Sequence, residues 1–267
     1  MQLPSIGRLP MQSKVSLQDR IILITGGGQG IGRALAQYAV SMGARVALID
    51  IDSAALVETV DMIGEDRSKG YVGDITDEQF VQNTVEAVVE YFGDLHGLIN
   101  NAGIVRAAMI HKMTLSQWHQ VLDVNLTGSF ICLSAVGRYF IDKAKKGDTN
   151  PGSIVNVSSD AGRRGTMGQI NYGASKSGVL GLTMSAAREW GRYNINVNSV
   201  CFGMVETSMT ETIRQDKFRD SYIKQIPLGR FSTPEDVAPA TCMLLSEMAS
   251  YITGQHLSIS GGFHMSA

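Results

Sequence analysis

The sequence predicts an α/β fold, a doubly wound parallel sheet of the Rossmann type with about seven strands, helices on both faces and a single domain. Two observations support this prediction. Short apolar runs alternate with longer amphipathic stretches along the whole chain, which is the pattern of repeated strand–helix units. The first apolar run also leads directly into a cluster of glycines that opens a helical stretch, a common beginning for such sheets.

Each element is expected from its own local pattern. Short runs rich in Val, Ile and Leu are expected to form strands, at 20–25, 45–49, 70–72, 97–99, 153–157, 195–200 and 256–259. Longer stretches with apolar residues at helical spacing are expected to form helices, at 30–42, 53–63, 77–92, 115–144, 171–193 and 234–246. No repeat or linker interrupts them, so we predict an N-terminal extension at 1–16 and one domain at 17–267. The region 203–230 has no strand signal and is interpreted as a lid over the carboxyl edge of the sheet.

Composition excludes several classes of protein. Hydrophobic residues make up 44% of the 267 residues and charged residues 18%, which is enough to build a substantial core. The net charge of −2 gives no indication of nucleic-acid binding. No secretory signal or apolar run of about 18 residues is present, so no membrane partner is expected. Three separated cysteines and five scattered histidines fit no metal site or disulfide framework, and we predict a cytoplasmic protein without a metal.

The glycine cluster after the first strand has the pattern T-G-x-x-x-G-x-G at 25–32. Glycines allow a sharp turn and a close approach to a pyrophosphate, and the following helix directs its first amides at that group. A plain glycine-rich turn is the alternative interpretation. The candidate cofactor contacts in this loop are Gly26, Gln29, Gly30, Ile31 and Gly32.

Asp50 ends the second strand, eighteen residues after Gly32. A carboxylate there can accept hydrogen bonds from both ribose hydroxyls of an adenosine and would repel a 2′-phosphate. Because the loop offers neutral Gln29 and no base, we predict NAD, with NADH preferred over NADPH. The alternative is a turn residue or a helix cap.

Polar residues also follow the third and fourth strands. Asp74 and Ile75 follow the third, and Asn101, Ala102 and Gly103 follow the fourth. Because the carboxyl ends of parallel strands share one edge, these residues are candidate cofactor contacts, although each could also be ordinary turn chemistry.

Tyr172 and Lys176 lie four residues apart, with Ser159 thirteen residues before the tyrosine. Residues at this spacing share one helix face, and an adjacent ammonium is expected to lower the pKa of a phenol. The three side chains therefore indicate proton transfer to or from a carbonyl or alcohol oxygen. A second pair, Tyr139 and Lys143, has the same spacing without a preceding strand, and we interpret it as the end of an amphipathic helix with a solvated lysine.

In this order, the motifs resemble those of the short-chain dehydrogenase/reductase family over about residues 17–262. The resemblance includes the glycine loop, Asp74, the N-N-A-G segment at 100–103, Asn125, Ser159, Tyr172, Lys176 and the V-E-T segment at 205–207. Within the family, the β-ketoacyl-carrier-protein reductases and NAD-linked alcohol dehydrogenases are most similar. The chain departs from the family at Phe202, where a proline usually precedes the glycine.

The resemblance implies a role for each of these residues. Tyr172 would be the general acid or base, Lys176 would lower its pKa and hold the nicotinamide ribose, and Ser159 would bind the substrate oxygen. Asn125 would keep a water in a proton relay. The backbone of Val205 and the hydroxyl of Thr207 would hold the carboxamide, and Gly203 would be a further cofactor contact. The family also implies a homotetramer, built partly through the helix after Asn171.

These features lead to three hypotheses about function. The first is an NADH-dependent 3-oxoacyl-thioester reductase, and the second is an NAD-dependent secondary-alcohol, polyol or steroid-type dehydrogenase. The third is a dinucleotide-binding regulatory protein without turnover. The partner in the first two is a small carbonyl or alcohol substrate. Candidate lining residues include Met167, Met204 and Met209, and Asp160, Arg163 and Arg164. The two arginines could attract an anionic group or form a solvated turn.

Overall fold

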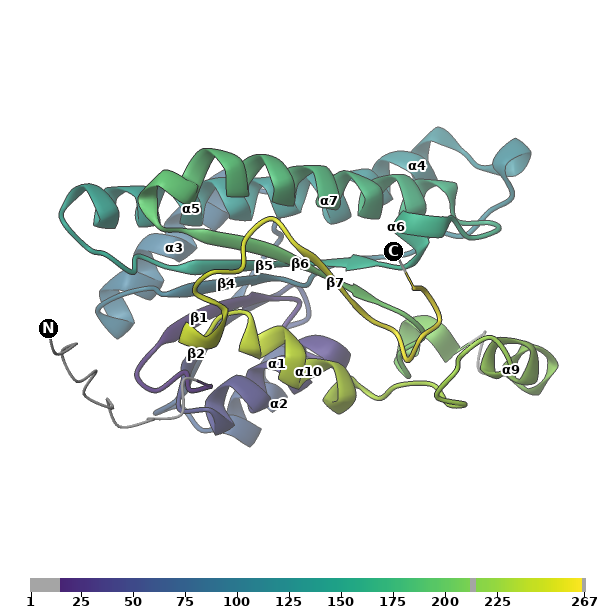
Figure 1. The fold of residues 1–267 in the computed structure, drawn as a ribbon, viewed down its shortest axis with the longest axis horizontal. Helices are drawn as coiled ribbons and strands as arrows, with labels where there is room; N and C mark the ends of the chain where they lie inside the picture. Colours follow the sequence, from purple (N-terminus) through teal and green to yellow (C-terminus); the bar gives the residue numbers. More distant parts are fainter. Residues whose placement is uncertain (1–14, 212–214, 266–267) are drawn as a thin grey trace, which may run out of the picture.

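The structure is a computed structural model that describes residues 15–211 and 215–265. Seven parallel strands form one sheet in the order β3-β2-β1-β4-β5-β6-β7 (Figure 1). The strands are β1 (Ile21–Thr25), β2 (Arg45–Asp50), β3 (Ser68–Val72), β4 (Gly97–Asn100), β5 (Ser153–Ser159), β6 (Asn196–Phe202) and β7 (His256–Ile259). The order runs outward in both directions from the boundary between β1 and β4, which confirms the predicted doubly wound sheet.

Helices cover both faces of the sheet, as predicted. One face carries α3 (Glu78–Phe92), α4 (Leu115–Leu122), α5 (Ser129–Lys145) and α7 (Ile170–Trp190), and the other carries α1 (Gly30–Ser41), α2 (Ser53–Ile63) and α10 (Pro234–Met243) (Figure 1). The strands are apolar on both sides, since alternate residues of β1 enter different cores: Ile22 and Ile24 pack with α1 and α10, whereas Ile21 and Leu23 pack with α3 and α5. This double burial explains why the strands are continuous apolar runs.

Local chemistry sets several helix starts. The carboxylate of Asp52 accepts the amide of Ala55 at the start of α2, and the carboxylate of Asp77 accepts that of Phe80 at the start of α3. Thr114 and Gln117 form a reciprocal capping box at α4. Because Asp52 is the cap of α2, Asp50 is not needed for that purpose.

The helix predicted at 115–144 is interrupted, and this prediction was wrong in detail. A π-helical segment, η2 (Asp123–Gly128), separates α4 from α5. A regular helical pattern in the sequence does not reveal the inserted residue of a π turn. The strands predicted at 153–157 and 195–200 extend to Ser159 and Phe202, so Ser159 ends β5 and does not follow it. A short helix, α6 (Ala161–Arg164), was not predicted.

The segment 115–145 is long and apolar enough, by length and composition alone, to cross a membrane. Half of its most apolar window is buried inside the protein, where Cys132, Val136 and Phe140 enter the core beside α3. Such burial is typical of a core helix. Among the described residues, no other helical segment is long and apolar enough to cross a membrane.

In the described part of the region interpreted as a lid there are two short helices, η4 (Ser208–Thr210) and α9 (Asp216–Ile223). Val205 forms an isolated parallel bridge with Ser232, which closes the base of the region. Figure 1 shows α9 beyond the end of the sheet, apart from both helical layers. Of the predicted N-terminal extension at 1–16, residues 1–14 lie outside the described residues.

Candidate active site

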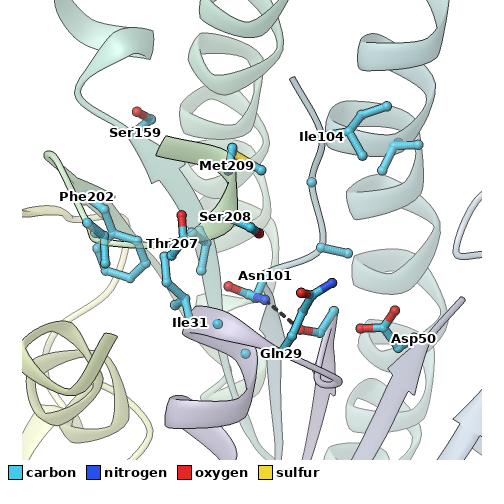
Figure 2. Close-up of a pocket in the computed structure, with 18 of the residues that line it drawn as sticks. Gln29, Ile31, Asp50, Asn101, Ile104, Ser159, Phe202, Thr207, Ser208 and Met209 are labelled. Atoms are coloured by element: carbon cyan, nitrogen blue, oxygen red, sulfur yellow. Dashed lines mark hydrogen bonds between the residues drawn. The ribbon is translucent and has the colours of Figure 1, made fainter. Parts of the chain in front are cut away.

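A cavity of about 470 Å³ lies at the carboxyl edge of the sheet. Its lining includes every residue predicted to contact the cofactor, namely Gly26, Gln29, Gly30, Ile31, Gly32, Asp50, Asp74, Ile75, Asn101, Ala102, Gly103, Tyr172, Lys176, Gly203, Val205 and Thr207. Ser159 also lines it, whereas Asn125 does not. Figure 2 shows Gln29 and Asp50 toward one end of the cavity and Ser159 toward the other.

The glycine loop is shaped for close backbone contact. Gly26 and Gly30 have φ of 65° and 54°, a region that side chains with a Cβ rarely adopt. A Cβ on Gly32 would lie 1.8 Å from the carbonyl oxygen of Gly26, so only glycine permits α1 to begin this close to the loop. The first amides of α1 therefore face the cavity with the positive end of the helix dipole, which suits a pyrophosphate.

The loop is attached to the end of β4 by Thr25 and Asn101. The Thr25 hydroxyl accepts the amides of Asn101 and Ala102, each at 3.0 Å. The Asn101 side chain donates to the carbonyls of Thr25 and Gly26 at 3.0 and 3.2 Å. These bonds join the two strand ends at the point where the strand order reverses. Thr25 is a positioning residue that the sequence interpretation had treated only as part of a motif.

Asp50 ends β2 and is oriented by backbone amides. One carboxylate oxygen accepts the amide of Gly28 at 2.9 Å, and the other accepts that of Asp52 at 3.1 Å. Arg33, the nearby base, is paired with Glu58 at 2.7 Å and donates to the carbonyl of Gly28. Among the described residues that line the cavity, Lys176 is the one cation. The end of the cavity at Asp50 therefore presents a carboxylate, with the neighbouring arginine held in an ion pair.

Tyr172 and Lys176 share one face of α7, and Ser159 faces them from the end of β5. The Lys176 Nζ lies 5.8 Å from the centre of the Tyr172 ring and donates to the carbonyl of Val157 at 2.8 Å. Lys176 is only 3% exposed. The three residues predicted for proton transfer are therefore brought together.

The predicted lowering of the tyrosine pKa is a point that the structure corrects. Burial raises the pKa of Tyr172, and hydrogen bonding with Ser159 opposes that effect only in part. Burial also lowers the pKa of Lys176, to about 8. The ammonium points at the carbonyl of Val157, and desolvation is the largest effect on the pKa of each of the two groups. At neutral pH the phenol is therefore protonated, which is the form that donates a proton.

Asn125 lies within η2 and is fully buried. Its Oδ1 accepts the amide of Ile104 at 2.8 Å, and its Nδ2 donates to the carbonyl of Ile104 at 3.0 Å and to Ser175 at 3.3 Å. A Cβ on Gly103 would lie 3.2 Å from Asn125 Oδ1 and 3.4 Å from Lys176 Nζ. Asn125 therefore lies behind the cavity and holds the segment that passes the lysine.

The second Tyr-x-x-x-Lys pair has a different environment. Tyr139 and Lys143 both donate to Asp94, at 2.8 Å each. Lys143 is thus paired and partly buried, and the interpretation as a solvated lysine was wrong. Asp94 lies just before β4, at the amino edge of the sheet, so this pair is at the opposite edge from the cavity.

Phe202, the departure from the family pattern, continues β6 by pairing with Ser159 and Ile259. Its side chain is 4% exposed and belongs to the core. A Cβ on the following Gly203 would lie 2.8 Å from the Cβ of Ser260. Phe202 thus ends β6, and Gly203 still packs closely against the segment after β7.

A smaller cavity of about 90 Å³ adjoins the first and shares with it residues that include Ser159, Tyr172, Phe202 and Met209. Its other lining residues include Asp160, Arg164, Met204, Tyr222 and Phe263. Arg163 and Met167 do not line it, whereas Tyr222 and Phe263 were not anticipated. Because Tyr222 comes from α9 and Phe263 from the C-terminal segment, their meeting could not be inferred from local sequence. Within the described residues, no group of three His, Cys, Asp or Glu side chains is placed to hold a metal.

The fold and the site define a dinucleotide-dependent oxidoreductase acting on CH–OH groups, and comparisons with known proteins agree. The family model described as enoyl-(acyl carrier protein) reductase matches residues 26–264. The chain is 40% identical to the 3-oxoacyl-[acyl-carrier-protein] reductase of Thermotoga maritima, over 92% of this chain and 98% of that one. It is 37% identical to (3R)-3-hydroxyacyl-CoA dehydrogenase of Canis lupus familiaris, over 96% and 100% of the two chains.

A solved structure gives the same result. The crystal structure of levodione reductase superimposes with a TM-score of 0.86 at 33% identity, covering 92% of this chain and 97% of the other. The chain therefore belongs to the short-chain dehydrogenase/reductase family, and its cofactor is a nicotinamide dinucleotide.

Proposed function

We propose that this protein is an NADH-dependent reductase of short 3-oxoacyl thioesters, with Ser159, Tyr172 and Lys176 as its catalytic residues and Asn125 as a positioning residue. The observation that carries the proposal is the convergence of Ser159, Tyr172 and Lys176 on one cavity with the glycine loop and Asp50. The names of the relatives support the substrate class, since two of them act on 3-oxoacyl or 3-hydroxyacyl thioesters.

The residues present fit a nicotinamide dinucleotide. The glycine loop suits the pyrophosphate because its turn is tight. A Cβ at Gly26 or Gly32 would collide with neighbouring backbone, so the glycines are what allow the first amides of α1 to lie at the cavity. Asp50 would accept the adenosine ribose hydroxyls, and Lys176 would hold the nicotinamide ribose. Asp74, Ile75 and the 101–103 segment would line the adenosine and its neighbouring groups, and Gly203, Val205 and Thr207 would lie at the carboxamide. The Asp50 carboxylate favours NADH, because it would repel the 2′-phosphate of NADPH.

The chain's own contribution to the reaction is positioning and proton transfer. When bound, NADH supplies the hydride to the carbonyl carbon. Ser159 and the Tyr172 hydroxyl would hold the carbonyl oxygen and stabilise the charge that develops on it. The protonated phenol of Tyr172 would then donate its proton to that oxygen, and the Lys176 ammonium would stabilise the phenolate that remains. Asn125 would keep Ile104 and Gly103 in place beside the lysine.

The decisive experiment is a steady-state assay of NADH and NADPH oxidation with acetoacetyl thioesters and a panel of free ketones. We expect turnover of the thioesters, with NADH preferred over NADPH. Turnover of free ketones alone would favour a secondary-alcohol dehydrogenase, a candidate supported by the likeness to levodione reductase. Dinucleotide binding without turnover of any carbonyl would instead indicate a regulatory protein.

The remaining proposals concern assembly, location and the lid. Phe130 on α5 and Met184 on α7 are both 52% exposed, and apolar surface on these long helices supports a homotetramer. Sedimentation of the purified protein tests this proposal.

We propose a cytoplasmic location, supported by three buried cysteines, all of them free. The region 203–230 would act as a lid, which protection from hydrogen exchange on cofactor binding would test.

A further inference from the structure

Arg163 and Arg164 are adjacent in sequence but have different surroundings in the structure. Arg163 donates to the carbonyl of His256 at 2.8 Å and to the hydroxyl of Ser258 at 3.4 Å, so it connects α6 to β7. Arg164 lines the smaller cavity beside Ser159 and Tyr172. One arginine therefore supports the sheet edge, and the other faces the space next to the catalytic pair.

The guanidinium of Arg164 lies over the ring of Phe263, 3.6 Å from its centroid. A stacked guanidinium uses its flat face for the ring and leaves its N–H groups, which lie in its plane, free to donate. Within the described part of the chain, no carboxylate forms an ion pair with Arg164. The stack thus orients a cation without neutralising it.

Asp160 is the acidic side chain that lines the same small cavity. It is 2% exposed, its Oδ1 accepts the Ser258 hydroxyl at 3.2 Å, and its Oδ2 has no hydrogen-bond partner. Burial raises the pKa of Asp160, and the nearby His264 and Arg164 oppose that effect. Asp160 is therefore bound to β7 through Ser258, and within the described residues it forms no ion pair with Arg164.

We propose that Arg164, held by Phe263, is a specificity-determining residue that binds an oxyanion of the substrate, so that the preferred substrates are short 3-oxo compounds carrying a carboxylate or a phosphate. The inference rests on the proposed reductase function. The cavity of about 90 Å³ holds only a small group beside the reacting carbonyl. Because Arg164 is itself exposed, a phosphate at the far end of a longer substrate would reach it from the solvent side. Two sources could supply the oxyanion, either a carboxylate of the substrate itself or a phosphate of a coenzyme A thioester.

Two matched substrate pairs separate these sources. Acetoacetate and methyl acetoacetate share a carbon skeleton and differ in the carboxylate charge. Acetoacetyl-CoA and acetoacetyl-N-acetylcysteamine share the thioester and differ in the phosphates. For Arg164→Met we expect kcat/KM to fall on the order of 10- to 100-fold for the charged member of one pair, while the neutral member changes less than about twofold. The affected pair identifies the source.

Matched variants test the geometry. Arg164→Lys should recover part of the loss, because it keeps the charge without the planar donors. Phe263→Leu should give a smaller loss with the same charge selectivity, since it removes the aromatic ring beneath Arg164 and keeps both the guanidinium and an apolar wall. Lys146→Gln is the control for net charge, because Lys146 is exposed at the end of α5 away from η2. It should leave all four substrates unaffected.

A binding measurement keeps this inference separate from the proposed function. Thermal-shift titration of the protein with NAD and 3-hydroxybutyrate or its methyl ester, and with 3-hydroxybutyryl-CoA or its N-acetylcysteamine analogue, requires no turnover. A preference of the wild type for the charged member of either pair, lost in Arg164→Met, would support the inference even if reductase activity were absent. Equal effects of Arg164→Met on the charged and neutral members of both pairs, in kinetics and in binding, would overturn it while leaving the reductase function intact.

Discussion

Asn125 forms a two-point contact with the backbone of Ile104, accepting its amide at 2.8 Å and donating to its carbonyl at 3.0 Å. The contact depends on the π turn of η2, which places Asn125 inside the protein between the segment after β4 and helix α7. A bulge of this kind is often found at functional sites. It gives Asn125 a positioning role that can be measured directly.

The first prediction concerns this contact. Asn125→Ala leaves the amide and carbonyl of the partly buried Ile104 without these partners, which should lower the free energy of unfolding by about 1–3 kcal/mol. Because Gly103 and Lys176 lie beside it, kcat should fall more than the affinity for NADH. Denaturant unfolding and steady-state kinetics measure both effects. A variant with full kcat and reduced stability would limit Asn125 to a structural role.

The second prediction concerns the proton donor. Tyr172→Phe keeps the partly buried ring and removes the hydroxyl, so reduction should slow by about 10²- to 10⁴-fold, with NADH affinity nearly unchanged. Tyr139→Phe is the matched control, since Tyr139 has the same spacing to a lysine and donates to Asp94 at the other edge of the sheet. It should keep full activity. Loss of NADH binding in Tyr172→Phe would contradict the assigned role.

The third prediction concerns pH. Burial lowers the pKa of Lys176 to about 8, so its positive charge is present below that pH and is lost as the pH rises through it. Reduction requires this charge beside the phenolate, and kcat/KM should therefore decline above about pH 8. The guanidinium of Lys176→Arg stays charged, so any remaining activity should lack the decline. An unchanged decline in that variant would assign it to another group.

The fourth prediction concerns the choice of cofactor. Asp50→Asn removes the charge of the residue that ends β2 and keeps its shape, so kcat/KM with NADH should fall about tenfold or more while NADPH is affected less. The exposed Asp61→Asn on α2 is the control for charge and should change neither value. Dissociation constants for both cofactors, measured by fluorescence, complete the comparison. An unaltered ratio of the two constants in Asp50→Asn would rule out the ribose contact.

The fifth prediction concerns stability in acid. The Nδ1 of His96 accepts the amide of Ile21, and its Nε2 lies 3.2 Å from Asp94, so the folded protein holds the ring neutral. Burial lowers the pKa of His96 to about 4. Since the unfolded chain binds a proton near pH 6.5 and the folded chain does not, stability should fall by on the order of 1–3 kcal/mol between about pH 6.5 and 4. Urea unfolding against pH measures this, and His96→Gln should show a shallower decline.

Much of the site could be predicted from the sequence because its chemistry is local. The glycine loop, Asp50 and the segment after β4 each follow an apolar strand, and a parallel sheet brings all such ends to one edge. The spacing of Tyr172 and Lys176 places them on one face of a helix. A regular period could not predict the inserted residue of η2, and a pKa could not be assigned before the burial of Tyr172 and Lys176 was known.

The sequence by itself determined the fold class, the alternation of the main strands and helices, and the cofactor-contact candidates that line the larger cavity, because these depend on periodicity and on short motifs. Only the tertiary structure decided that Arg163 binds β7 while Arg164 stacks on Phe263. It also decided that Tyr139 donates to Asp94 while Tyr172 lines the cavity. These differences arise from contacts with residues that are distant along the chain. Contacts between separate segments, and the loss of water that they cause, are set by packing and not by local pattern.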